Sequence, residues 1–436
     1  MIKKERKIKF KIYSLGCKVN QYDSAVLSNL LKLRGFLEIK KDDDFNLNLI
    51  IVNSCSVTHS AINKDRRLIN LLRRKYLQAK IVLIGCWPKI YNITGLEVDL
   101  ISGHKDQIKN LRAIEKIFFK KSLSNIKKDC LKNNLNIIND RSRYFIKIQD
   151  GCQQFCSYCV IPLARGPLKS RSMREVIEEI TLATKNGFKE IVLSGIHLGL
   201  YGCDLGAKDK NLYSLLKKIL SIKNIGRIRL SSIEITEVSD DIINLIASNS
   251  KMCRHLHIPL QSGSDKILKL MNRPYNTKYY YERINKLRKK IPDIAISTDI
   301  IVGFPGETNS DFQNTYNFSK KIAFSKIHVF SFSAHEKAPA FHFPNKVDIV
   351  DIKKRSLSLR DLSKKMENDY RKKILKNHKS LQLLIENIVK GKIRAKSEFY
   401  FDLNIAFSDF LKHNPKLSLS KTPQLIGSLI NYNFEK

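Results

Sequence analysis

The sequence has no long apolar run. Of its 436 residues 43% are hydrophobic, yet no apolar stretch approaches the roughly 20 residues that a membrane-spanning helix needs. The basic N-terminus, residues 1–10, leads into alternating residues and not into the apolar segment of a signal peptide. We therefore expect a globular, cytoplasmic chain with no membrane contact, long enough for two or three domains.

Acidic residues are scarce relative to basic ones. The chain has 41 Asp and Glu against 79 Lys and Arg, which gives a formal net charge of +38. Such a charge suits a polyanionic partner such as RNA. Because the sequence is also rich in Ile, Asn and Lys throughout, the compositional drift of an AT-rich genome stays open as a second explanation.

The cysteines do not form an even set. Nine cysteines in a long chain without a signal peptide argue against a disulfide framework and for thiolates that are kept reduced for metal. Six of them fall into two sets with an interpretable geometry. The other three, Cys130, Cys203 and Cys253, are expected to be packing residues.

The first set, Cys152, Cys156 and Cys159, forms a Cys-x3-Cys-x2-Cys cluster on one predicted loop. Three thiolates can hold three corners of an iron–sulfur cube, whereas a complete protein site would offer four. The open iron is then available to a small molecule, as in catalytic metal sites. A structural zinc site is the alternative, but it needs a fourth ligand, and no Cys or His follows until His197.

The second set follows the strands of a predicted N-terminal α/β unit. Residues 8–103 alternate short apolar strands with helical stretches, which predicts a parallel sheet with strands at 9–14, 49–52 and 81–84. A cysteine follows each strand within three residues. Because the carboxyl ends of parallel strands lie along one edge, we expect these thiols to meet, although three unrelated strand-end cysteines remain the alternative. The three residues are Cys17, Cys55 and Cys86.

Six further strand candidates alternate with helical stretches after a Lys/Asn-rich connector at 104–142. Six βα repeats fit an open, partial TIM-type barrel whose site lies at the carboxyl ends of the strands. The three-cysteine loop directly follows the first of these strands. The candidates are 144–148, 191–193, 227–230, 255–258, 294–301 and 326–330.

The C-terminal part reads as a charged helix over 347–377 followed by β-like runs at 381–389 and 399–407. A small β barrel fits these runs. Only Gly391 and Gly427 are available there for the tight turns and bulges that a small barrel uses.

With these motifs in place, the chain resembles the radical S-adenosylmethionine (SAM) methylthiotransferases along nearly its whole length. Segments 14–24, 52–58 and 84–86 are similar to motifs of that family's N-terminal domain, and 152–171, 255–265 and 297–307 are similar to its radical core. The resemblance implies a methylthiotransferase domain at 8–120, a radical SAM barrel at 138–370, and a weakly matched, degenerate TRAM-like β domain at 373–436 that would bind tRNA.

The resemblance also implies two [4Fe–4S] clusters and SAM. Cys152, Cys156 and Cys159 would hold the cluster that passes an electron to SAM, and the other triad would hold a cluster that supplies sulfur, methylated by a second SAM. Tyr158 would lie against the adenine of SAM. The remaining SAM contacts, to its amine and ribose, would come from Ser194, Gly195, Ser232 and Glu234 at the ends of the second and third barrel strands.

Simpler interpretations of these side chains stay open. Tyr158 also fits a half-exposed loop aromatic, and Glu234 also fits a structural ion pair with Arg229 or another base. The basic residues Arg165, Lys169 and Arg171 just past the cluster loop fit either contacts with tRNA phosphate or a solvated basic face.

Within the family, Gly-Cys-Lys-Val-Asn-Gln at 16–21, with 194–199 and 231–234, looks most like the branch that acts on N6-threonylcarbamoyladenosine (t6A) at position 37 of tRNA. The expected activity is therefore radical methylthiolation of C2 of t6A to ms2t6A, with tRNA, SAM and an electron donor such as flavodoxin or ferredoxin as partners. Methylthiolation of N6-isopentenyladenosine (i6A) or of a ribosomal-protein side chain is the alternative. A non-enzymatic RNA-binding protein with structural metal sites is the third possibility, disfavoured by the open cysteine spacing.

Overall fold

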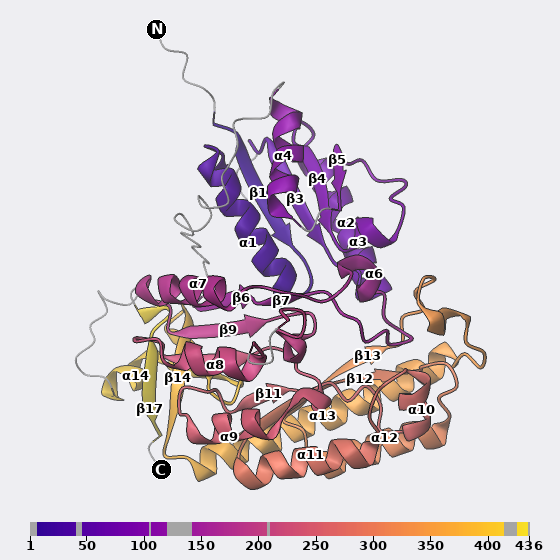
Figure 1. Cartoon of the computed structure of the whole chain (residues 1–436), viewed down its shortest axis with the longest axis vertical. Helices are drawn as coiled ribbons and strands as arrows, with labels where there is room; N and C mark the ends of the chain where they lie inside the picture. Colours follow the sequence, from indigo (N-terminus) through magenta and orange to yellow (C-terminus); the bar gives the residue numbers. More distant parts are fainter. Residues whose placement is uncertain are drawn as a thin grey trace. The chain divides into compact units, whose positions relative to one another are not determined.

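The computed structural model describes residues 7–40, 46–103, 106–119, 142–206, 210–413 and 425–434. The chain divides into two compact units, each built from segments that are not continuous in sequence (Figure 1). The first unit contains residues 1–138, 150–168 and 333–338, and the second contains 139–149, 169–332 and 339–436. Cys130 lies outside the described residues.

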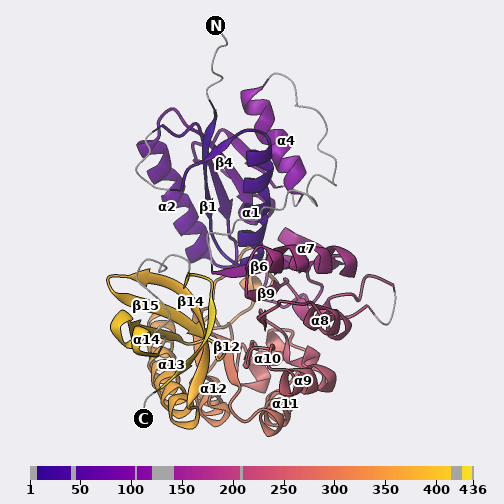
Figure 2. The ribbon, with the colours of Figure 1, turned by 90° about the vertical axis from the view of Figure 1, so that its left-hand side faces the viewer.

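The first unit is built on a five-stranded parallel sheet in the order β2-β1-β3-β4-β5. Its central strand β3 is buried at every position, so its apolar residues face helices on both sides. Helices α1 and α4 pack on one face and α2 packs on the other, as Figure 2 shows. The elements are β1 (Lys9–Ser14), α1 (Lys18–Leu33), β2 (Leu37–Glu38), β3 (Leu49–Ser54), α2 (His59–Lys75), β4 (Lys80–Gly85), α3 (Trp87–Ile90), β5 (Leu100–Ser102), α4 (Gln107–Phe118) and α6 (Ile161–Arg165).

The second unit contains the predicted partial barrel. Two three-stranded parallel sheets, β6-β9-β10 and β11-β12-β13, are linked by the parallel bridges Ile228–Met252 and Ser232–His257. All six predicted strands are present, so the α/β fold class is confirmed. The strands are β6 (Arg143–Lys147), β9 (Glu190–Ser194), β10 (Arg227–Leu230), β11 (His255–His257), β12 (Ala295–Val302) and β13 (Lys326–Ser331), with the short β7 (Gln149–Asp150) and β8 (Lys169–Ser170) near the first.

Helices follow these strands, as the βα pattern requires. Capping residues fix several of the helix starts: α7 and α12 both begin with a reciprocal capping box, at Ser172 with Glu175 and at Thr308 with Asp311. The helices are α7 (Met173–Lys185), α8 (Leu212–Leu220), α9 (Asp240–Ser248), α10 (Asp265–Leu270), α11 (Thr277–Lys290), α12 (Asn309–Ile322) and the charged α13 (Ile349–Asn377). In the described part of the chain no helix has the length and apolarity to cross a membrane.

An antiparallel sheet in the order β16-β15-β14-β17 forms the C-terminal part of the second unit. Lys390 and Gly391, with φ of 49° and 71°, make the tight turn between β14 and β15, and Gly427 has φ of 87° just before β17. Both predicted glycines are therefore used in turns. The elements are β14 (Ser380–Val389), β15 (Lys392–Ser397), β16 (Asp402–Ala406), α14 (Phe407–His413) and β17 (Leu429–Asn433).

This sheet has its own apolar core, which includes Leu383, Phe401 and Phe410. The predicted runs 381–389 and 399–407 correspond to β14 and β16, whereas β15 and β17 were not predicted. The division into domains at 8–120, 138–370 and 373–436 stays a prediction.

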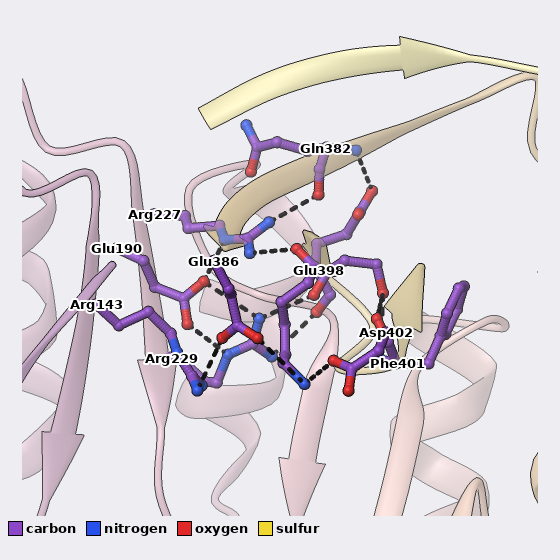
Figure 3. A network of polar contacts seen from close by, with 11 residues as sticks. Arg143, Glu190, Arg227, Arg229, Gln382, Glu386, Glu398, Phe401 and Asp402 are labelled. Atoms are coloured by element: carbon purple, nitrogen blue, oxygen red, sulfur yellow. Dashed lines mark hydrogen bonds and ion pairs between the residues drawn. The ribbon is translucent and has the colours of Figure 1, made fainter. Parts of the chain in front are cut away.

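A buried ion-pair network attaches the C-terminal sheet to the barrel strands (Figure 3). The Glu190 carboxylate accepts from Arg227 Nε at 2.6 Å and from Arg229 Nε at 2.9 Å, and all three side chains are fully buried. Both guanidinium groups also donate to backbone carbonyls of the sheet, among them those of Gln382 (2.8 Å) and Ser397 (3.1 Å). Burial disfavours the charged carboxylate, but Arg229 and Arg227 outweigh it and hold the pKa of Glu190 at about 2.

Tyr400 completes this attachment from the side of the sheet. It adopts a left-handed backbone conformation with φ of 72°, which is costly for an aromatic residue. Its ring stacks on His255 with centroids 4.4 Å apart and lies 4.8 Å from the Arg229 guanidinium. The strained turn is therefore held in place by contacts with the barrel.

We expect Glu190→Gln to lower the free energy of unfolding by about 3–5 kcal/mol, because it leaves two buried arginines without their anion. Guanidinium denaturation of the full chain measures this. The matched control Glu178→Gln removes an exposed i,i+4 partner of Arg174 and should cost less than about 1 kcal/mol. Equal losses in the two variants would contradict the assigned role.

The same carboxylate predicts a pH dependence of stability. Since the folded pKa of Glu190 lies below its ordinary value of 4.5, its contribution to the free energy of unfolding should be complete above pH 4.5 and fade as the pH falls toward 2.

Candidate active site

The three strand-end cysteines of the first unit lie together. Cys55 and Cys86 directly follow β3 and β4, and Cys17 precedes α1, after β1. These strands are neighbours in the sheet, and a Cβ on Gly16 would lie only 2.8 Å from Cys55 Sγ, so the loop that carries Cys17 passes directly over Cys55. The loops that carry Cys17 and Cys55 therefore lie against each other, and the joint use of the three thiols in one metal site stays a prediction.

Polar side chains hold the three loops in this arrangement. Asn20 Nδ2 donates to the carbonyl of Leu15 at 3.0 Å and to that of Ser54 at 2.8 Å, which joins the first two loops. The backbone N–H of Cys86 donates to the same Ser54 carbonyl at 3.1 Å, which joins the third. Asp65 accepts from the Cys55 N–H at 2.8 Å. The loops are therefore fixed through backbone groups, while the sulfur of Cys86 also contacts the side chains of Asn20 and Arg165.

The thiols of Cys17, Cys55 and Cys86, which we call the thiol pocket, suit a metal cluster. Burial raises the pKa of the Cys55 thiol to about 12 in the metal-free protein, so a metal that binds it must displace a proton. Among the described residues, no three Cys, His, Asp or Glu side chains are arranged around a single ion. A cluster does not need such an arrangement, because each thiolate binds a different iron atom.

The loop that carries Cys152, Cys156 and Cys159 is closed at its base. The N–H of Cys152 donates to the Gly166 carbonyl at 3.1 Å. Gly151 has φ of 77°, and a Cβ there would lie 1.9 Å from the Pro167 carbonyl oxygen, so only glycine fits. This loop belongs to the first unit together with the other cysteine triad.

Backbone N–H groups of the loop point at its sulfur atoms. Gln154 donates to Cys152 Sγ and Ile161 donates to Cys159 Sγ, both at 3.4 Å. Such bonds orient metal-bound thiolates and stabilise their charge. The residues of the loop therefore fit the cluster that the spacing predicts.

Arg165 does not occupy the position expected of a tRNA contact. It is the last residue of α6, only 4% exposed, and its Nε donates to Cys86 Sγ at 3.2 Å. Its Nη1 bonds Asp23 at 2.9 Å and Asp150 at 3.2 Å. Neither interpretation left open for this residue, a phosphate contact or a solvated basic face, fits a side chain that is buried among acidic partners.

Within the second unit, Ser194 and Gly195 lie at the carboxyl end of β9, where they were predicted to be. Ser194 Oγ donates to the carbonyl of Ile146 on β6 at 2.9 Å. Gly195 leaves room for Gln149, whose Oε1 accepts from the N–H of His197 at 2.8 Å. The Ser194 hydroxyl thus fastens two barrel strands, and Gly195 permits the turn beside them.

Glu234 lies beyond the end of β10 and forms an ion pair with Arg273. Arg229 pairs with Glu190 instead, so the structural partner of Glu234 is another base, as one of the open interpretations allowed. Burial raises the pKa of Glu234 even though Arg273 opposes the shift.

Sequence reasoning missed the residues that surround Glu234. His197 pairs with Glu237, one turn of the chain beyond Glu234, and Arg273 approaches from the segment after α10. Only His197 had a signal, since it lies inside the 194–199 motif. Ser232 and Tyr158 are both half-buried, and Tyr158 belongs to the first unit whereas the other predicted SAM contacts belong to the second.

A partial parallel barrel whose first strand leads into a three-cysteine loop defines the radical SAM class of proteins. The model of the Radical SAM superfamily matches residues 146–319, and that of Uncharacterized protein family UPF0004 matches residues 9–101. The fold is similar to that of TsrM from Kitasatospora setae, a radical S-adenosylmethionine methyltransferase solved with cobalamin and a [4Fe–4S] cluster. The TM-score is 0.53 at 16% identity, over 75% of each chain.

Proteins of similar sequence identify the family within the radical SAM class. The chain is 37% identical over 370 residues to the threonylcarbamoyladenosine tRNA methylthiotransferase MtaB of Bacillus subtilis, covering 82% of this chain and 81% of that protein. It is 37% identical over 400 residues to the MtaB of Thermotoga maritima, 89% of each chain. It is also 33% identical over 433 residues to the tRNA-2-methylthio-N(6)-dimethylallyladenosine synthase of Endomicrobium trichonymphae, 98% of this chain and 96% of that protein. The chain belongs to the radical SAM tRNA methylthiotransferase family, whose members use SAM and [4Fe–4S] clusters.

We expect the two triads to have separable roles. Cys156→Ala should abolish reductive cleavage of SAM, whereas Cys55→Ala should leave cleavage measurable but give no methylthiolated product. Each variant should lose about four iron atoms per chain after anaerobic reconstitution. Chromatographic detection of 5′-deoxyadenosine and iron analysis measure both effects.

The control is Cys203→Ala, an exposed cysteine outside both triads, which should retain cleavage, product and iron. Loss of all SAM cleavage in a folded Cys55→Ala protein would show that the division of roles is wrong.

Proposed function

We propose that this protein methylthiolates C2 of t6A at position 37 of tRNA and so forms ms2t6A. The observation that carries the proposal is the 37% identity over most of both chains to two proteins named for this substrate. The presence of both cysteine triads, each gathered by its own part of the first unit, supports it.

The reaction needs radical chemistry, because the C2–H of adenine is neither acidic nor electrophilic enough for acid–base catalysis by side chains. When bound, the clusters and SAM supply the radical, the sulfur and the methyl group. The protein then has to hold, orient and shield them. In this proposal Cys152, Cys156 and Cys159 bind one cluster, and their loop N–H groups orient the sulfur atoms.

Cys17, Cys55 and Cys86 bind the second, auxiliary cluster in the same proposal. Asn20 and the Cys86 N–H fix their loops through the carbonyls of Leu15 and Ser54, so the three cysteines are positioned before metal arrives. Preorganisation of this kind lowers the entropic cost of assembling a site.

The SAM contacts are proposed for the residues named from the resemblance. Tyr158 would face the adenine, and Ser194, Gly195, Ser232 and Glu234 would surround the amine and ribose. The Ser194 hydroxyl already donates to a strand carbonyl, so it would act on SAM as an acceptor. Glu234 would act with Arg273 as one charged pair.

The partners follow from the substrate. Beyond tRNA and SAM, we propose a low-potential electron donor such as flavodoxin or ferredoxin, and a cytoplasmic location shared with tRNA. The C-terminal sheet would contribute a TRAM-like tRNA-binding surface. The net charge of +38 supports a polyanionic substrate.

The i6A activity is the second candidate, because relatives named for a dimethylallyladenosine product also match the chain over nearly its full length. The two substrates differ in chemistry. The threonyl carboxylate of t6A needs a cation or N–H groups, whereas the isopentenyl tail needs an apolar pocket. A site built for the carboxylate would reject i6A, because its own polar groups would be left unpaired.

Deletion of the gene tests the substrate. We expect ms2t6A to disappear from tRNA nucleosides and ms2i6A to remain, as measured by mass spectrometry. A plasmid copy of the wild-type gene should restore ms2t6A, and a Cys156→Ala copy should not. Loss of ms2i6A with ms2t6A intact would assign the protein to the isopentenyl branch.

Binding of tRNA should weaken steeply with salt. Because Lys and Arg contacts to phosphate release counterions, we expect affinity to fall roughly 10-fold or more between about 50 and about 200 mM salt. Filter binding or fluorescence anisotropy measures this, with binding of SAM over the same range as the control. A salt-independent tRNA affinity would count against a nucleic-acid substrate.

A further inference from the structure

Arg165 connects the two cysteine-bearing parts of the first unit. It lies six residues after Cys159, at the end of the short helix that follows the three-cysteine loop, and its Nε–H donates to the sulfur of Cys86 at 3.2 Å. Cys86 also shares one apolar cluster with Val160 and Ala164 of the same segment. The segment that follows one triad is thus packed against a ligand candidate of the other.

The remaining donors of the guanidinium are directed at fixed polar partners. Nη1 bonds Asp23 on α1 at 2.9 Å and Asp150, just before the three-cysteine loop, at 3.2 Å, and Nη2 bonds the Asn20 side chain. Asn20 in turn holds the backbones that lead into Cys17 and Cys55. These polar partners of Arg165 thus come from the surroundings of Cys17, Cys55 and Cys86 or from the base of the three-cysteine loop.

A buried cation in this position acts on a metal cluster through its charge. Reduction of a [4Fe–4S] cluster from the 2+ to the 1+ state adds one negative charge, which a nearby positive charge and an N–H···S bond both stabilise. Asp23 and Asp150 bring two carboxylates to this one cation, so its effect on the cluster depends on its direct N–H···S bond to Cys86. At 4% exposure the side chain is shielded from solvent, so this effect is little weakened by screening.

We propose that Arg165 is a positioning residue for the auxiliary cluster: it donates to the Cys86 thiolate, raises the reduction potential of that cluster, and ties the three-cysteine loop to it. The inference rests on the proposed ligand role of Cys86. It requires no new cofactor, because the cluster is the one that the family already uses.

The test reads the auxiliary cluster alone. In a background with Cys152→Ala, Cys156→Ala and Cys159→Ala, about four iron atoms per chain should remain after reconstitution. Their midpoint potential is measured by EPR during titration with dithionite and redox mediators. In this background Arg165→Gln should shift the midpoint to a more negative value, and Arg165→Lys, which keeps the charge but not the planar N–H fork, should shift it less.

Asp23→Asn is the matched variant that separates charge from structure. It removes one of the two negative charges that contact the same guanidinium, so the net charge beside the cluster becomes less negative, and the midpoint should shift to a more positive value. A merely structural role for Arg165 would move both variants in the same direction or neither. Opposite shifts support the proposal, and shifts of the same sign, or none with Arg165→Gln, overturn it.

Two further outcomes are separable. If Arg165→Gln holds no cluster, the sign of the Asp23→Asn shift decides: a positive shift supports the proposal and any other result overturns it. If Cys86→Ala in the same background keeps all its iron, Cys86 is not a ligand. That result would remove the proposed auxiliary site itself and not only the role of Arg165.

Discussion

Parallel strands bring their carboxyl ends to one edge of a sheet, and both units of this protein depend on that constraint. In the first unit it gathers residues from three loops, 38 and 31 positions apart, into one thiol pocket. In the second it places Ser194 and the residues after β10 on adjacent strand ends. The residues of each of these two sets come from separate loops, so each set requires the sheet beneath it, whereas Cys152, Cys156 and Cys159 share one loop.

The strands and their order, which follow from a pattern repeated along the chain, were predictable from sequence. Strand β10 has the predicted bounds, and Cys17, Cys55 and Cys86 follow neighbouring parallel strands because strand order follows from the alternation of strands and helices and from its handedness. The pairing of charged side chains was not predictable in this way. Arg165 and Arg273 take carboxylate partners up to 142 residues away in the chain, and nothing in a local pattern indicates which carboxylate a base will meet once the chain has folded.

Strand β15 was missed because it also depends on contacts with distant parts of the chain. β15 begins directly after a two-residue turn at Lys390 and Gly391, and its sequence of alternating lysine, arginine and small residues has too few apolar side chains to predict a strand. Pairing with β14 on one side and β16 on the other supplies what the sequence of β15 lacks. Tertiary contacts overrule weak local preference there.

Not all of the basic residues behind the net charge of +38 lie at the surface, because several arginines are buried in ion pairs. Arg227 and Arg229 use their donors on Glu190 and on carbonyls of the C-terminal sheet, and Arg165 uses its donors on the thiol pocket. These arginines hold the fold together and are not available to a nucleic acid. The net charge of the sequence is therefore larger than the positive charge that can contact phosphate at the surface.

The discontinuous first unit has a consequence for synthesis of the chain. The thiol pocket has its own cysteines once residue 86 is made, but Ala338 joins Cys86 in its apolar cluster, and His335 bonds Tyr91 at 2.8 Å and the Val57 carbonyl at 3.1 Å. A nascent chain emerging from the ribosome thus presents these three thiols long before residues 333–338, which pack beside Cys86, are made. Protection of these thiols from oxidation, or delivery of metal only to the finished chain, must then come from the cell rather than from the fold.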